Sequence, residues 1–184
     1  MMVPVPSDDY RRERLGVSQD WPVMARVVCE TRVCKRGHLR IGCSAAVLDP
    51  TGTRILLVRR ADNGRWAVPG GYMEPGETFT ETCSREVLEE TGLRVCPGRL
   101  IAVYTSPHVL LEYPDGSRLQ LVVLHFAAEL VEGELRASLE TPAVQYFSRE
   151  EIERLDMSDF NRQRVDDAFA AEPITLVRED FDLS

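Results

Sequence analysis

The segment GYMEPGETFTETCSREVLEETGL, residues 71–93, decides what this chain of 184 residues can be. It holds six glutamates and one arginine, a net charge of −5, whereas the whole chain has a formal net charge of −8. An acidic surface that serves only solubility does not require its charge to be gathered in one segment. This segment is therefore the strongest candidate for a functional site.

Capping signals predict a helix in the second half of the segment. Thr78 with Glu81 three residues later has the pattern of a capping box, and Gly92 can adopt the left-handed conformation that ends a helix. Ser148 and, more weakly, Ser158 carry similar signals. We expect helices to begin near all three positions, and the last of them to end before residue 173.

The predicted helix carries three carboxylates on one face. Glu86, Glu89 and Glu90 are spaced i, i+3 and i+4, which places them within an arc of about 100°, with Val87 on the opposite, core-facing side. Like charges at this spacing repel one another. Arg85 can bridge one carboxylate, and three hard oxygen ligands are also what Mg²⁺ or Mn²⁺ accepts.

A glycine-rich loop comes directly before this helix. Gly70 and Gly71 follow the short apolar segment 66–68, and Pro75–Gly76 makes a second bend. Such a loop exposes a carbonyl that can bind a metal and amides that can hold a phosphate. The order of strand, glycine loop and carboxylate helix predicts a site for metal-assisted attack on a phosphoanhydride.

The spacing of the fixed residues resembles a known family motif. Gly71, five residues, Glu77, seven residues, Arg85-Glu86-Val87, one residue, Glu89-Glu90, one residue and Gly92-Leu93 match every fixed position of the Nudix box. At average composition, a chance match in a chain of this length has a probability on the order of 10⁻⁷. The approach WAVPGG at residues 66–71 is also similar to the family, and the resemblance covers roughly residues 40–157.

The resemblance implies a fold and a set of site residues. The expected fold class is α/β, a single-domain Nudix-type α/β/α sandwich with a mixed sheet. Glu86, Glu89 and Glu90 would be catalytic and would hold Mg²⁺ or Mn²⁺, with the carbonyl of Gly70 as a further metal ligand. Arg85 would orient a glutamate, and water activated by the metal would be the nucleophile.

The resemblance also implies a reaction. A small nucleotide-derived substrate, a nucleoside diphosphate linked to another group, would be cleaved at its diphosphate, with a nucleotide sugar or ADP-ribose favoured. Two alternatives stay open: a house-cleaning nucleoside triphosphate pyrophosphatase, and an inactive module that senses a nucleotide. About 27 residues follow position 157, too few for the DNA-binding helical domain that such regulators carry.

The general base is not fixed by the motif. Many relatives place a further catalytic glutamate before the strand at residues 144–147, where this chain has Gln145, which cannot act as a base. Glu140 or Glu112 could replace it, and Glu86 or Glu89 could equally be the base. Glu140 is the candidate that we include among the catalytic residues.

Arginines near the box are candidates for substrate contact. Arg59, Arg60 and Arg65 flank the loop before the glycines and could neutralise phosphates, although arginines at strand ends are often simply solvated. Glu77 of the box is a fourth candidate for substrate binding, and His108 a weaker one.

The rest of the sequence predicts mainly strands and few helices. We expect an N-terminal extension at 1–39, a Nudix domain at 40–157, and a C-terminal helix and tail at 158–184. A helix is expected at 7–15, and alternation of apolar residues predicts a strand at 23–33. Further expected strands are 41–48, 54–59, 95–104, 109–113, 119–130 and 144–147, with turns at 49–52 and 114–116.

Composition excludes several classes of function. The acidic balance argues against long nucleic acid as a partner. No apolar run approaches the roughly 18 residues that a membrane span needs, so no membrane partner is expected. The five scattered cysteines indicate reduced thiols, and hence a cytoplasmic protein.

Two further patterns concern the cysteines and an edge of the sheet. Cys29, Cys34, His38 and Cys43 superficially suggest zinc binding, but their spacing matches no zinc pattern and cysteines in apolar strands usually serve packing. The strand expected at 23–33 would be an extra sheet edge, and unpaired edges favour pairing with a second chain. A homodimer is therefore expected.

Overall fold

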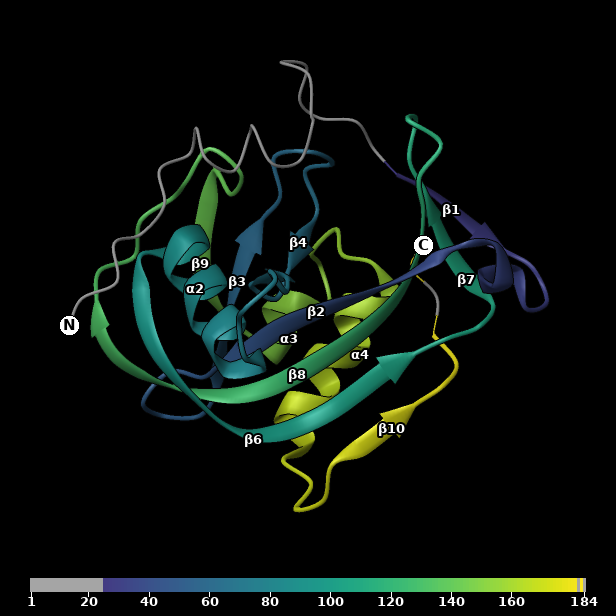
Figure 1. Cartoon of the computed structure of the whole chain (residues 1–184). Coiled ribbons are helices and arrows are strands. Elements are labelled where there is room, and N and C mark those ends of the chain that lie inside the picture. Colours follow the sequence, from purple (N-terminus) through teal and green to yellow (C-terminus); the bar gives the residue numbers. More distant parts are fainter. Residues whose placement is uncertain (1–24, 182, 184) are drawn as a thin grey trace.

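The computed structural model describes residues 25–181 and 183 (Figure 1). The strands are β1 (Arg26–Cys29), β2 (His38–Val47), β3 (Arg54–Arg59), β4 (Trp66–Ala67), β5 (Gly70–Tyr72), β6 (Leu93–Thr105), β7 (Val109–Glu112), β8 (Arg118–Gly133), β9 (Ala143–Ser148) and β10 (Leu176–Arg178). The helices are the 3₁₀ helix η1 (Val33–Arg36), α2 (Phe79–Thr91), α3 (Arg149–Ile152) and α4 (Asp159–Ala170).

The larger of two sheets is mixed. Its strands follow the order β1-β7-β8-β2-β5, with β6 also paired to β8 and β10 paired to β6. The β2–β8 and β6–β10 pairs are parallel and the others antiparallel. A smaller antiparallel sheet has the order β4-β3-β9. Figure 1 shows β2, β8 and β6 running alongside one another through the middle of the molecule.

Helices cover both faces of this arrangement. Because side chains alternate along a strand, Cys43 and Ala45 of β2 pack with Cys83 and Val87 of α2, whereas Ala46 joins the core formed with α3 and α4. The expected α/β/α sandwich with a mixed sheet in one domain is confirmed. The C-terminal helix is part of that core, since its buried residues pack with those of β3 and β6.

Local signals position helix α2. Thr78 and Glu81 form a reciprocal capping box, and Gly92 ends the helix at φ 77°, as predicted. Ser148 and Ser158 accept the capping hydrogen bonds of α3 and α4, and α4 ends at residue 170, before the proline at 173.

Three segments differ from the sequence prediction. Residues 70–72 were expected to form a loop but are strand β5, because the backbone of Gly70–Tyr72 pairs with Ser44–Gly42 of β2. In the described part of 23–33, only Arg26–Cys29 is a strand, and a 3₁₀ helix begins at Val33. The start of that segment and the helix expected at 7–15 lie outside the described residues. Strand β10, which was not predicted, extends the sheet beside β6.

Strand β1 lies at one end of the larger sheet, paired to β7. This fits the expected sheet edge, and the homodimer inferred from it stays a prediction. Within residues 25–181 and 183, no helix has the length and apolar character needed to cross a membrane.

Candidate active site

The glycine segment and the carboxylate helix are in direct contact. The amide of Gly70 donates a hydrogen bond of 2.8 Å to Oε2 of Glu90. At Gly71, a β-carbon would lie 2.4 Å from Cδ of Glu86, so the absence of a side chain lets this carboxylate pack on the strand. Strand β5 and helix α2 thus bring Gly70, Glu86 and Glu90 together, and their role as metal ligands stays a prediction.

Arg85 connects three of the acidic side chains. Its Nε lies 2.5 Å from Oε1 of Glu77, and its Nη1 lies 2.6 Å from Oε1 of Glu86 and 3.3 Å from Oε2 of Glu89. Nη2 also donates to the carbonyl of Tyr72. Partial burial alone would lower the pKa of Arg85, but the carboxylates of Glu77 and Glu86 raise it well above its usual range. One bridged carboxylate was expected, and the guanidinium reaches three.

The carboxylate of Glu77 is fixed by hydrogen bonds from neighbouring protein groups. Its carboxylate accepts hydrogen bonds from Arg85, from the hydroxyl of Thr82 at 2.8 Å and from the amide of Glu74 at 2.8 Å. Partial burial would raise the pKa of Glu77, but these hydrogen bonds outweigh it and lower the pKa to about 2. These contacts indicate that Glu77 fixes the position of the Arg85 side chain. A direct contact of Glu77 with substrate stays a prediction.

We expect Glu77 to contribute stability that depends on pH. Because its pKa in the folded protein is below the ordinary 4.5, this stability is complete above about pH 4.5 and is lost as pH falls towards 2. Urea midpoints measured from pH 7 to pH 2.5 should therefore converge for the wild type and Glu77→Gln at the acid end. Glu153→Gln, at an exposed position, is the matched control and should follow the wild type throughout. A constant gap between wild type and Glu77→Gln at all pH values would contradict this assignment.

The box carboxylates are more buried than a charged helix face would be. Glu86 is 4% exposed and Glu90 9%. Burial, reinforced by the charge of Glu86, raises the pKa of Glu90 to about 8 despite the hydrogen bond from Gly70. A cation would stabilise the negative charge of two buried carboxylates that lie next to each other, as those of Glu86 and Glu90 do. Carboxylate oxygens are ligands that Mg²⁺ and Mn²⁺ accept, so the donor chemistry fits either ion.

These donors do not yet converge as a metal cage. Among the described residues, no group of three or more His, Cys, Asp or Glu side chains is arranged to hold a metal ion. Glu86 and Glu89 both contact Nη1 of Arg85, while Glu90 is directed to the amide of Gly70. The residues of a hard-cation site are gathered here, and side-chain rotation would be needed for them to share one ion.

The three flanking arginines have different surroundings. Arg60 forms an ion pair with Asp62 and also interacts electrostatically with Glu90. Arg59 donates through Nε to the carbonyl of Gly64, and Arg65 lies 3.4 Å from Asp156. Arg60 therefore lies within electrostatic reach of a box carboxylate, and a phosphate contact for any of the three arginines stays a prediction.

The candidates for the general base lie in different surroundings. The negative charge of Glu140 contributes to the raised pKa of Glu90, so this side chain lies within electrostatic reach of the site. Glu112 is on β7, where it pairs with Arg118 across the hairpin at 2.7 Å. Gln145 is exposed on β9. This arrangement favours Glu140 over Glu112.

Sequence reasoning missed two polar residues of α4 that lie next to the glycine segment. The amide of Val68 donates to Oδ1 of Asn161 at 3.3 Å, and Arg164 is 8% exposed and interacts electrostatically with both Arg60 and Glu90. The signal in the sequence was an arginine within the apolar stripe of a predicted helix, where a charged residue requires an explanation.

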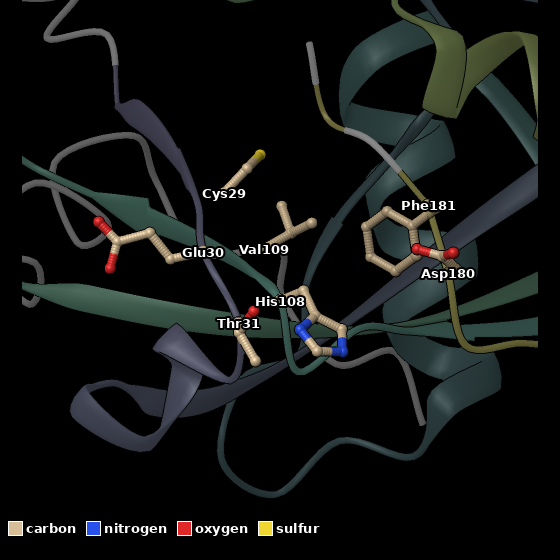
Figure 2. Close-up of a pocket in the computed structure, with 7 residues that line it drawn as sticks. All are labelled: Cys29, Glu30, Thr31, His108, Val109, Asp180 and Phe181. Atoms are coloured by element: carbon tan, nitrogen blue, oxygen red, sulfur yellow. The ribbon is translucent and has the colours of Figure 1, made fainter.

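An open hollow of about 590 Å³ lies elsewhere on the molecule, between the end of β1, the start of β7 and the C-terminal segment (Figure 2). His108 stands at its centre, with Asp180 and Phe181 opposite Thr31, and Nδ1 of His108 accepts a hydrogen bond from the amide of Arg32. None of the predicted site residues except His108 lines it. We therefore do not assign this hollow to the diphosphate.

The chain matches known proteins over most of this region. The family model for the NUDIX domain matches residues 38–168. A MutT-like protein of Streptomyces ambofaciens is 37% identical over 99 residues, which are 54% of this chain and 58% of that protein. An ADP-ribose pyrophosphatase of Methanocaldococcus jannaschii is 35% identical over 105 residues, 55% of this chain and 59% of that protein. The matches thus span less than two thirds of either relative.

Solved structures share the fold. The crystal structure of a NUDIX hydrolase from Nitrosomonas europaea has a TM-score of 0.60 and 24% identity, covering 77% of this chain and 79% of that one. At this identity the likeness concerns the fold alone.

Proposed function

Because the chain belongs to the Nudix family, whose model matches residues 38–168, we propose that it hydrolyses a phosphoanhydride bond in a nucleotide derivative. The observation that carries the proposal is the contact between the glycine segment and α2, in which Glu86 packs on Gly71 and Glu90 accepts from Gly70. Two buried carboxylates and a neighbouring backbone carbonyl form a donor set that suits a hard divalent cation.

Each residue has a distinct part in the proposed reaction. Glu86, Glu89 and Glu90, with the carbonyl of Gly70, would hold Mg²⁺ or Mn²⁺, and the bound metal would supply Lewis-acid chemistry and an activated water. Arg85 orients Glu86 and Glu89 through its hydrogen bonds. Arg60 neutralises a substrate phosphate, and Glu140 accepts the proton of the attacking water.

We favour a nucleoside diphosphate derivative as the substrate. The supporting observation is the similarity to an ADP-ribose pyrophosphatase, to which this chain is 35% identical over 105 residues. Attack at the diphosphate would give a nucleoside monophosphate and a phosphorylated remainder. The similarity to a MutT-like protein keeps nucleoside triphosphates as the second candidate, with a nucleoside monophosphate and pyrophosphate as products.

A substrate screen tests this proposal. ADP-ribose, nucleotide sugars, dinucleoside polyphosphates and (deoxy)nucleoside triphosphates would be incubated with the full chain and Mg²⁺ or Mn²⁺ at mildly alkaline pH, and products resolved by ion-exchange chromatography. We expect monophosphate release from ADP-ribose or a nucleotide sugar, abolished by EDTA. No hydrolysis of any substrate with either metal would refute the enzymatic function and leave the nucleotide-sensing alternative.

We expect Glu140→Gln and Glu112→Gln to differ in activity. Glu140→Gln removes the proposed general base. Because the metal would also activate the attacking water, this loss should lower kcat at least about tenfold. Glu112 forms a surface ion pair with Arg118, so Glu112→Gln should keep kcat within about twofold of the wild type. Steady-state kinetics on the best substrate of the screen measure both. Full activity in both variants would place the base among the box glutamates.

A further inference from the structure

The short turn that carries Gly70 forms hydrogen bonds with α2, α4 and β2. Pro69 has no backbone N–H, so Val68 and Gly70 provide the donors of this turn. The amide of Gly70 donates to Glu90 on α2, and the amide of Val68 donates to Oδ1 of Asn161 on α4. The carbonyl of Pro69 accepts from Ala45 at 3.0 Å. Asn161 thus supplies the one contact of these three that comes from the C-terminal helix.

The side chain of Asn161 is itself fixed in place. Its Nδ2 donates to Oγ of Ser158, the cap of α4, at 3.0 Å, and its Oδ1 also accepts from Nη2 of Arg164 at 2.5 Å. The guanidinium of Arg164 lies 4.4 Å over the ring of Phe160, and its Nε has no hydrogen-bond partner among the described residues. An amide with all its polar atoms engaged makes a rigid support for the Val68 amide.

A structural explanation alone accounts poorly for this arrangement. Among the described residues, no carboxylate forms an ion pair with the buried guanidinium of Arg164. Such burial is unfavourable, and an apolar side chain would fill the same space at lower cost. Arg164 is nonetheless buried beside the turn, and its charge interacts with that of Glu90. Polar groups behind metal ligands commonly orient those ligands, and their loss typically reduces metal affinity 10–100-fold.

From this geometry we propose that Asn161, supported by Arg164, is a positioning residue for the divalent metal site, acting through the Val68–Pro69–Gly70 turn on the carbonyl of Gly70 and on the carboxylate of Glu90. The inference rests on the proposed function, because it requires that Gly70 and Glu90 bind the metal. It adds that helix α4, which lies outside the box, affects how tightly Gly70 and Glu90 bind the metal.

The test measures metal binding directly, without turnover. Mn²⁺ is titrated into the full chain and free Mn²⁺ is followed by electron paramagnetic resonance for the wild type, Asn161→Leu and Asn161→Asp. Leucine has the same branched side-chain shape but no acceptor, so the Kd of this variant should rise at least about tenfold. Aspartate keeps the acceptor for Val68 and the partner for Arg164, so its Kd should stay within about threefold of the wild type.

Two controls separate positioning from other effects. Arg162→Leu removes hydrogen bonds from the same helix to the carbonyls of Ile152 and Leu155, and should lower Tm without changing the Kd for Mn²⁺. Ser158→Asp in the Asn161→Leu background adds a negative charge at the cap of the helix without restoring an acceptor at position 161, and it should not restore binding. Circular dichroism verifies folding, and Asn161→Ala replaces Asn161→Leu if the latter does not fold.

The outcomes are distinct. If the wild type does not bind Mn²⁺, the proposed function fails and this inference with it. If the wild type binds Mn²⁺ and the Kd of Asn161→Leu or Asn161→Ala is within about twofold of it, the proposed function stands and the role of Asn161 is refuted. Equal weakening by leucine and aspartate, or recovery through Ser158→Asp, would likewise refute it.

Discussion

Replacing Glu90 with glutamine is expected to lower kcat by at least about 10²-fold while leaving the fold intact. Glutamine keeps the acceptor for the amide of Gly70, which lies 2.8 Å from Oε2 in the wild type, so the contact between β5 and α2 is preserved. It removes the negative charge with which a divalent cation would be held. Loss of an interaction that stabilises developing charge in the transition state typically costs 10²–10³ in kcat.

The stability of the same variant should change in the opposite direction. The pKa of Glu90 is about 8 in the folded chain, mainly through burial, and near 4.5 when unfolded, so this residue favours folding less as pH rises above 4.5. Glutamine removes that unfavourable contribution. In EDTA at pH 7.5, the Tm of Glu90→Gln should therefore equal or exceed that of the wild type.

Kinetics and calorimetry on matched variants examine both parts of this prediction. Glu81→Gln is the control, because it makes the same substitution on the same helix at an exposed position and retains a capping box. It should keep kcat within about twofold. Near-normal turnover in Glu90→Gln would remove Glu90 from the set of metal ligands, and a marked fall in its Tm would mean that the residue is structural.

The parts of the fold that follow from local signals could be predicted from the sequence. The start and end of α2 depend on Thr78, Glu81 and Gly92, which lie within one short segment and act on nearby backbone groups. The common face of the box glutamates follows from helical periodicity alone. Strand β3 was predicted at residues 54–59 and is observed at those residues, because its apolar run is bounded by a clear turn.

The features that depend on distant parts of the chain could not be predicted. Strand β5 exists because Gly70–Tyr72 pair with β2, some thirty residues earlier in the chain. A segment of three residues carries no sequence pattern that would predict this pairing. The burial of Glu86 follows from the same pairing, since it places Gly71 against the helix. The contact between Asn161 and Val68 joins residues 93 positions apart, and only the packed core brings them together.

Replacing Gly71 with alanine is expected to lower kcat about 10²-fold with little loss of stability. The three heavy atoms nearest to an added β-carbon, at 2.4–2.6 Å, all belong to the carboxyl group of Glu86. The end of a flexible side chain can move, so the strand would survive. The displaced carboxylate would lose its 2.6 Å ion pair with Arg85, and a misplacement of about 1 Å at a reacting centre can cost 10²-fold in rate.

A double-mutant cycle shows whether this effect passes through Glu86. Since alanine at position 71 would act by displacing that carboxylate, Gly71→Ala combined with Glu86→Gln should be no slower than Glu86→Gln alone, whereas independent effects would multiply. Gly98→Ala is the matched control, because its β-carbon would meet the carbonyl of Ala127 at an ordinary 3.8 Å, and it should keep wild-type kcat. Multiplying effects in the double variant, or wild-type activity in Gly71→Ala, would show that the close packing of Glu86 on β5 does not set the geometry of the reaction.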